Sequence, residues 1–173
     1  HVNDDEAFCF SCENGNIEIV ELLLQLDGER KINIHAEQEY GFRLACEYGH
    51  LEIVKLLLNV DERNKVDIHI LDNYGFRSAC CNGHIEIVKL LLSLKGRRNI
   101  KLNLNCIDAF QHACFNGHLE IAKLFLDLKV SIFISPVKRV ETLTYACQRG
   151  HIDVVKFLLE LGLILNSLIN CFN

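Results

Sequence analysis

The chain has 173 residues, half of them hydrophobic and only one a proline, so it has ample apolar surface to bury and shows little sign of disorder. Its formal net charge of −5 argues against a nucleic-acid partner held mainly by phosphate contacts. No apolar run approaches the ~20 residues that cross a bilayer, and no signal peptide opens the sequence. We therefore expect an intracellular, cytoplasmic protein with no membrane partner.

One stretch is copied along the whole chain. It runs from Ala45 to Leu58 as Ala-Cys-Glu-Tyr-Gly-His-Leu-Glu-Ile-Val-Lys-Leu-Leu-Leu. Its central glycine recurs at nearly constant spacing, as Gly15, Gly49, Gly83, Gly117 and Gly150. A period of about 34 residues is typical of a stacked repeat array. It predicts a single array of five units, over about residues 3–36, 37–70, 71–104, 105–137 and 138–173.

Each unit is predicted to contain two helices separated by its glycine. In the second unit, Phe42, Ala45 and Cys46 have the i, i+3, i+4 spacing of one helical face, which predicts a two-turn helix over 41–47. The glycine then supplies a left-handed break. A second apolar face follows in the segment 51–59, where Leu51 and Val54 begin the second helix. The same pair is expected in the other four units.

Five of the nine cysteines occupy one position of the repeat. They are Cys12, Cys46, Cys80, Cys114 and Cys147. Equivalent positions in packed helices lie about 8–10 Å apart, whereas a disulfide needs Cα atoms within about 7 Å. We therefore expect small, buried, reduced thiols and a reducing compartment. Cys81 stands at a variable position and is a candidate for an exposed, reactive thiol.

The histidines after the glycines raise the alternative of a metal-dependent enzyme. His50 and three counterparts precede an acid by two residues, and His-x-Glu also occurs in zinc-dependent nucleobase deaminases. Here the pair recurs in four units and no Pro-Cys-x-x-Cys motif follows, so we expect each histidine to cap the turn by bonding neighbouring backbone. The lone Cys9-Phe-Ser-Cys12 has no second cysteine pair at zinc-site spacing, which favours core packing. We predict no enzyme, no cofactor and no metal.

The run from Gly49 to Leu58 resembles the second helix of the ankyrin repeat, and the resemblance covers all five units. It implies an all-α fold, an α-solenoid of five ankyrin-like helix-turn-helix repeats. The family's Thr-Pro-Leu-His becomes Tyr40-Gly-Phe-Arg43 here, which keeps only the apolar third position. The segments between units differ in length from the family's, which predicts shortened β-fingers. One full finger is expected at residues 134–142, with Pro136 at a turn or edge.

The short-finger style is similar to the ankyrin arrays of large DNA viruses of amoebae and of some protists. For a viral protein, this implies the host cytoplasm and an adaptor that delivers host proteins to ubiquitin ligases. The chain contains no methionine and begins within the repeat motif, so we expect it to be an excerpt of a longer array.

The ankyrin family binds proteins on a concave face built from the fingers, the first helices and the two residues before each Gly-His pair. Carried onto this chain, the resemblance nominates Glu47, Tyr48, Asn82, Phe115, Asn116 and Arg149 before the glycines, Glu37, Glu39, Tyr40 and Tyr74 in the fingers, and Arg43, Arg77, Gln111 and Tyr145 on the first helices. Aromatic anchors among acids favour a protein partner that carries basic residues. We predict a monomeric protein–protein interaction module. The alternative is a structural or virion scaffold component that self-associates.

Overall fold

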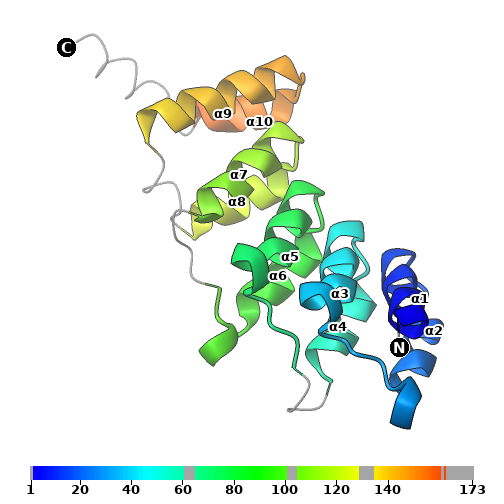
Figure 1. Cartoon of the computed structure of the whole chain (residues 1–173). Helices are drawn as coiled ribbons and strands as arrows, with labels where there is room; N and C mark the ends of the chain where they lie inside the picture. The colour runs from blue at the N-terminus through cyan, green and yellow to red at the C-terminus, as the bar shows by residue number, and fades with distance from the viewer. Residues whose placement is uncertain (1, 61–64, 101–104, 129–134, 161, 163–173) are drawn as a thin grey trace. The chain divides into compact units, whose positions relative to one another are not determined.

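Ten α-helices make up most of the described chain. The structure is a computed structural model that describes residues 2–60, 65–100, 105–128, 135–160 and 162 (Figure 1). Within those ranges there is no β-strand. The helices follow one another in five pairs, each joined by a short turn that contains glycine. This all-α architecture is consistent with an α-solenoid, and the predicted fold class is confirmed.

Each pair consists of a first and a second helix. The first helices are α1 (Val2–Glu13), α3 (Ala36–Tyr48), α5 (Ile70–Cys81), α7 (Asn105–Phe115) and α9 (Pro136–Gln148). The second helices are α2 (Ile17–Leu24), α4 (Leu51–Leu58), α6 (Ile85–Ser93), α8 (Leu119–Asp127) and α10 (Ile152–Glu160). Short 3₁₀ turns, η1 (Gly28–Arg30) and η3 (Gly96–Arg98), follow α2 and α6.

The chain divides into two compact units, which we describe separately. The first comprises residues 1–79 and 86–100, and the second residues 80–85 and 101–173. In the first unit, α1 packs against α3 and α2 packs against α4. In the second unit, α7 packs against α9 and α8 against α10. Like helices therefore stack on like helices within each unit.

The turn after α3 shows why the repeat needs glycine. Gly49 ends the helix with φ +85° and ψ 21°, a left-handed conformation that side chains disfavour, and its N–H bonds to the carbonyl of Ala45. Helix α4 begins two residues later, as predicted. Its buried side chains are Ile53, Val54, Leu57 and Leu58.

Left-handed turns lie where the shortened fingers are predicted in the second and third repeats. Glu37, Gln38 and Glu39 have φ values of 49°, 61° and 61°. Residues 71–73 repeat the same backbone conformation with φ values of 49°, 57° and 59°. Such a conformation costs a residue other than glycine roughly 1–2 kcal/mol. Contacts elsewhere must therefore hold these turns in place.

Arginines on the first helices provide such contacts. Arg43 Nε donates to the carbonyl of Gln38, and its Nη2 donates to the carbonyl of Glu37, both over 2.9 Å. Arg77 Nη2 donates to the carbonyl of Leu71 over 3.0 Å. The corresponding position in α7 is glutamine, and α7 contains no residue with positive φ. The arginine and the left-handed turn therefore occur together.

The full finger predicted over residues 134–142 is wrong from residue 135 onward, where helix α9 replaces it. Ser135 is the N-cap, its hydroxyl accepts the backbone N–H of Lys138 over 3.3 Å, and Pro136 opens the helix. Serine at the N-cap and proline in the first turn are both favoured at helix starts, and this local signal outweighs the length argument. Residue 134, like the tail after 162, lies outside the described ranges.

The row of cysteines is buried in four repeats and exposed in the fifth. Cys12 and Cys46, with Cys80 and Cys114, have no exposed surface, and burial raises the pKa of Cys114 to about 12. The next first helix covers the thiol. A Cβ added at Gly41 would lie 3.3 Å from Cys12 Sγ. The expectation of burial is wrong for Cys147, which is exposed.

His50 and His118 reach back to the preceding repeat, so the predicted capping of their own turn is wrong for these two histidines. His50 Nε2 donates to the carbonyl of Glu13 over 2.7 Å, and His118 Nε2 donates to the carbonyl of Cys81 over 2.9 Å. Neither histidine makes a side-chain bond at its own helix N-terminus. A Cβ at Gly15 would lie only 2.5 Å from His50 Nδ1. The glycine is therefore needed for its backbone conformation and for room beneath the imidazole.

Candidate functional site

A cluster of two tyrosines, an arginine and a glutamate lies on the first helices of the first unit. The guanidinium carbon of Arg43 is 5.1 Å from the ring centre of Tyr40 and 5.3 Å from that of Tyr74. The hydroxyl of Tyr74 donates to Glu47 Oε2 over 3.2 Å. We call these four residues the tyrosine cluster. Arg43 thus contacts both rings through cation–π interactions while its N–H groups hold the left-handed turn.

Tyr48 stands at the end of α3, with half of its surface exposed. The negative charge of Glu13 and a hydrogen bond to that carboxylate raise the pKa of the Tyr48 phenol. The phenol donates, so Glu13 orients a ring that is otherwise open to solvent. An exposed, oriented aromatic side chain is a typical anchor for a protein partner.

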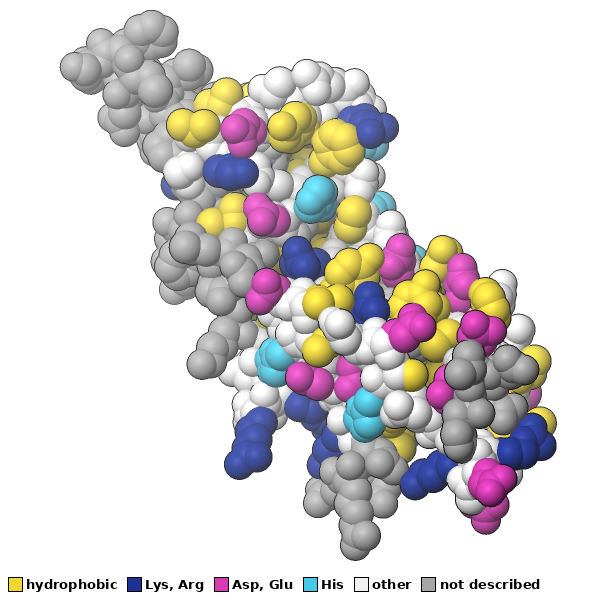
Figure 2. All heavy atoms as spheres, in the orientation of Figure 1, with side chains coloured by type: hydrophobic (Ala, Val, Ile, Leu, Met, Phe, Trp, Pro, Cys, Tyr) yellow, Lys and Arg dark blue, Asp and Glu magenta, His cyan; other side chains and the backbone are white. Residues whose placement is uncertain are grey.

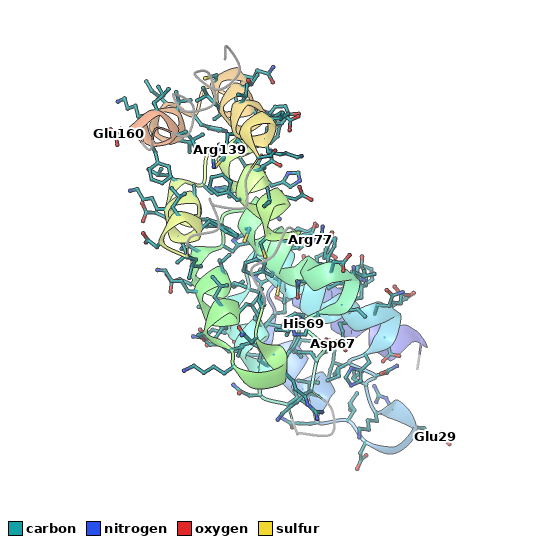
Figure 3. The ribbon with its side chains drawn as sticks, turned by 90° about the vertical axis from the view of Figure 1, so that its left-hand side faces the viewer. Glu29, Asp67, His69, Arg77, Arg139 and Glu160 are labelled. Atoms are coloured by element: carbon teal, nitrogen blue, oxygen red, sulfur yellow. The ribbon has the colours of Figure 1, made fainter. Side chains whose placement is uncertain are left out.

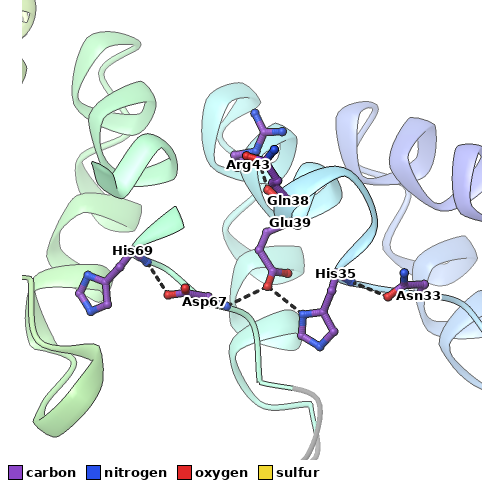
Figure 4. Close-up of polar contacts among 7 residues, drawn as sticks. All are labelled: Asn33, His35, Gln38, Glu39, Arg43, Asp67 and His69. Atoms are coloured by element: carbon purple, nitrogen blue, oxygen red, sulfur yellow. Dashed lines mark hydrogen bonds and ion pairs between the residues drawn. The ribbon is translucent and has the colours of Figure 1, made fainter. Parts of the chain in front are cut away.

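Glu39 does not belong to the partner-binding surface on which it was predicted. Its carboxylate is buried, and Oε1 accepts from His35 Nδ1 over 2.7 Å and from the backbone N–H of Asp67 over 3.1 Å (Figure 4). The side chains of Asn33 and Asp67 in turn accept the backbone N–H groups of His35 and His69. Glu39 therefore ties its own repeat to the loop of the next one.

A contact equivalent to that between Glu39 and Asp67 occurs one repeat earlier. There, Asp5 Oδ1 accepts the backbone N–H of Asn33 over 2.9 Å. Asp5, Glu39 and Asn73 occupy one position of three successive repeats, and Asn73 accepts from His69 in the same manner as Glu39 from His35. Recurrence of an acidic or amide side chain at this position was the signal that could have identified the structural role.

A second cluster lies in the second unit, on α7, α9 and the turn after α9. The rings of Phe115 and Tyr145 meet edge to face, with centres 5.7 Å apart and planes at 88°. The guanidinium carbon of Arg149 lies 4.3 Å from the ring centre of Phe115. We call these three residues the phenylalanine cluster. A pocket of about 410 Å³ lies beside it, lined in part by Asp108, His112, Lys138 and Glu141.

Other nominated residues make internal contacts. Gln111 is buried, and its Nε2 donates to Thr142 Oγ1 over 3.2 Å and to the carbonyl of Lys138 over 3.4 Å. Asn116 Nδ2 donates to the carbonyl of Cys81 over 2.8 Å. Arg77, labelled on α5 in Figure 3, is bonded to its own turn, whereas Asn82 is exposed. Gln111 therefore offers little surface to a partner.

A pocket between α1 and α3 was not predicted. Its volume is about 390 Å³, and four of its lining residues are the acids Asp5, Glu6, Glu13 and Glu37. Its other lining residues are Cys9, Phe10, Ala36, Tyr40 and Leu44. Figure 2 shows hydrophobic and acidic side chains interleaved where α1 and α3 lie. The exposed Phe10 among acids on α1 was the available sequence signal, and it falls outside the positions transferred from the family.

Cys9 in this pocket is not a reactive thiol. Burial, together with the negative charges of Glu37 and Asp5, raises its pKa to about 11. Because the thiolate is the nucleophilic form, Cys9 stays protonated and unreactive near neutral pH.

Comparison with protein families finds a match to a model described as ankyrin repeats (3 copies), over residues 1–72 and 76–168. The chain belongs to the ankyrin-repeat family. Ankyrin repeats generally mediate protein–protein interaction, and ankyrin-repeat proteins are typically non-enzymatic. No curated protein matches the chain.

In both units, side chains at the recurring positions of the ankyrin repeat have a structural role. Side chains that recur, such as the buried cysteines and the histidines over glycine, hold neighbouring repeats together. In the described part of this ankyrin chain, no group of three or more His, Cys, Asp or Glu side chains is arranged to hold a metal ion. None of the helices described is long and apolar enough to cross a membrane.

Proposed function

We propose that this ankyrin-repeat chain acts as a monomeric adaptor that binds a protein partner along its first helices, the side that forms the concave face in the family. The observation that carries the proposal is the pair of aromatic clusters, one in each unit, together with the exposed Tyr48, which has no aromatic counterpart at its position in the other repeats. Tyr48 is 50% exposed and Tyr145 is 41% exposed. Aromatic and arginine side chains are the residues that most often dominate the energy of protein interfaces.

The charge of this side favours a partner with basic residues. Glu13 and Glu47 bond to the hydroxyls of Tyr48 and Tyr74, so their carboxylates stand beside the exposed Tyr48 ring and the half-buried Tyr74 ring. The chain as a whole carries a formal net charge of −5. Complementary charge would speed encounter with a basic partner and help to reject acidic ones. The resemblance to arrays of large DNA viruses stays a hypothesis, under which the partner is a host protein in the cytoplasm.

Partner capture with matched variants tests the proposal. Proteins retained by the chain from a eukaryotic cytosolic extract are identified and purified, and their affinity is titrated against the Tyr48→Ala/Phe115→Ala variant. The control is Leu22→Ala/Ile152→Ala, which removes two exposed side chains from second helices. We expect affinity to fall at least tenfold for the first variant only, as for interface anchors.

Two results would contradict this function. Equal affinity of wild type and the Tyr48→Ala/Phe115→Ala variant, with unchanged melting, would remove those residues from the binding surface. Ordered self-association that grows with concentration in sedimentation would favour the alternative of a scaffold component over a monomeric adaptor.

A further inference from the structure

The pocket between α1 and α3 combines an apolar wall with a ring of acids. Phe10 is 61% exposed and, with Leu44 and Ala36, supplies apolar surface. Carboxylates come from both helices, with Glu13 on α1 and Glu37 on α3. A ligand that fits must therefore present an apolar stem and a cationic end.

The charges in the pocket are one-sided. Four carboxylates line it, and among the described residues its lining includes no lysine, arginine or histidine. Arg43 lies beside Tyr40, a lining residue, but its N–H groups are already bonded to the carbonyls of Glu37 and Gln38. Even with this charge counted, the pocket keeps an excess of negative charge that would attract a cation.

A side chain fits better than a metal ion. The four carboxylates line a pocket of about 390 Å³, and no three acidic, histidine or cysteine side chains in the described residues converge as metal ligands do. A long cationic side chain instead lays its methylene groups on apolar surface and keeps its charged head among the acids.

Among cationic side chains, arginine matches the aromatic content of the pocket. A guanidinium is planar, stacks on aromatic rings and bonds carboxylates through several N–H groups. The chain itself makes such contacts, with Arg43 near Tyr40 and Tyr74 and with Arg149 near Phe115. Tyr40 also lines the pocket, which makes the pocket continuous with the tyrosine cluster.

We propose that the pocket between α1 and α3 receives an arginine side chain of the protein partner, with the guanidinium near Phe10 and Tyr40 and bonded to the carboxylates of Glu13 and Glu37. This inference rests on the proposed function and specifies its partner as a segment that carries an accessible arginine. Lysine, which lacks the planar group, binds more weakly here.

Short capped peptides test this directly. The probe is the heptapeptide Gly-Ser-Ala-Arg-Ala-Ser-Gly, titrated into the ¹⁵N-labelled 173-residue chain and followed by NMR shifts. We expect shifts concentrated in α1 and α3. Replacing the arginine by uncharged citrulline should weaken binding at least tenfold, and lysine should weaken it severalfold. Equal binding of the citrulline or the lysine peptide, or shifts concentrated elsewhere, would overturn the assignment.

Variants separate the pocket from general electrostatic attraction. Glu13→Gln/Glu37→Gln should weaken binding of the arginine peptide at least tenfold, and Phe10→Ala should weaken its binding severalfold. The control Glu52→Gln/Glu86→Gln removes two acids that pair with lysines on second helices, and it should leave binding unchanged. A similar loss in the control would overturn the pocket, because it would show that only net charge matters.

The pocket and the proposed function can fail independently. A captured partner that binds wild type and Glu13→Gln/Glu37→Gln equally would overturn the pocket and leave the proposed function standing. A partner whose binding is weakened by both Glu13→Gln/Glu37→Gln and Tyr48→Ala/Phe115→Ala would support both. Selective peptide binding in α1 and α3, without any protein partner, would support the pocket and count against the adaptor.

Discussion

Replacing Arg43 by alanine is expected to loosen the left-handed turn at residues 37–39 and, with it, the start of α3. The guanidinium donates two hydrogen bonds of 2.9 Å to carbonyls of that turn and lies within 5.3 Å of two tyrosine ring centres. The turn should therefore depend on this residue.

The expected effect is about 2 kcal/mol. Hydrogen bonds from a charged donor contribute roughly 1.5 kcal/mol each at the lower end of their range, and an exposed cation–π contact contributes about 0.5–1 kcal/mol. Their sum is about 4 kcal/mol. Relaxation of the turn would recover part of the strain, roughly 1–2 kcal/mol for each left-handed residue that leaves this conformation. One to two residues that relax bring the net loss to about 2 kcal/mol.

Amide hydrogen exchange over residues 36–48 measures this effect locally. Local measurement suits a repeat protein, in which unfolding need not be a single transition. A loss of about 2 kcal/mol predicts exchange in α3 that is about 30-fold faster. Arg43→Lys should be nearly as damaging, because one ammonium cannot reproduce the fork of donors. Gln38→Gly should slow exchange, since glycine adopts positive φ without strain.

The control for this prediction is Arg149→Ala, which removes a single stacking contact on Phe115. Its effect on exchange in α9 should stay below about fivefold. A change of less than threefold over residues 36–48 in Arg43→Ala would refute the reasoning, and so would full rescue by lysine.

Two further predictions concern packing and pH. In urea denaturation, Gly41→Ala should lower the free energy of unfolding by about 1–2 kcal/mol despite alanine's helix preference, because its Cβ would lie 2.6 Å from the buried Phe8 ring. Gly75→Ala, whose Cβ would lie 3.2 Å from its nearest neighbours, should change the free energy of unfolding by less than about 0.5 kcal/mol. A larger loss of stability in Gly75→Ala than in Gly41→Ala would contradict the close packing of α3 against α1 at Gly41. Burial lowers the pKa of His118, so the unfolded chain binds that proton first, and stability should fall as pH drops below about 6.5. His118→Gln should show a shallower fall between pH 7 and 5, and equal slopes would contradict this assignment.

Much of the fold could be predicted from the sequence because local rules determine it. The glycine after each first helix adopts the left-handed conformation that only glycine takes readily, and Gly49 does so as predicted. The second helices follow from the spacing of their apolar residues, as the buried Val54 and Leu57 show. Repetition strengthened both inferences, since each pattern was present five times.

The errors arose where contacts between repeats decide the structure. His50 bonds a carbonyl of the preceding repeat, that of Glu13, and a local capping rule cannot show this. Glu39 was placed on the binding surface because the ankyrin resemblance puts the finger positions there, yet its carboxylate is buried between His35 and the loop before α5. At Ser135 the opposite happened, because a local helix-start signal was outweighed by an argument from family spacing.

The candidate binding residues show that variation between repeats does not by itself identify a binding position. Gln111 differs from the arginines at positions 43 and 77, yet it is buried and bonded to Thr142. The change from arginine to glutamine at this position therefore accompanies a different internal hydrogen bond, not a binding site. Exposure must be added as a second criterion, and Tyr48 meets both, whereas Phe115 is partly covered by Tyr145 and Arg149. Phe10 also meets both, since its counterpart in the next repeat, Leu44, is buried. The first unit, with Tyr48 and Phe10, is therefore where we expect a partner to gain most of its binding energy.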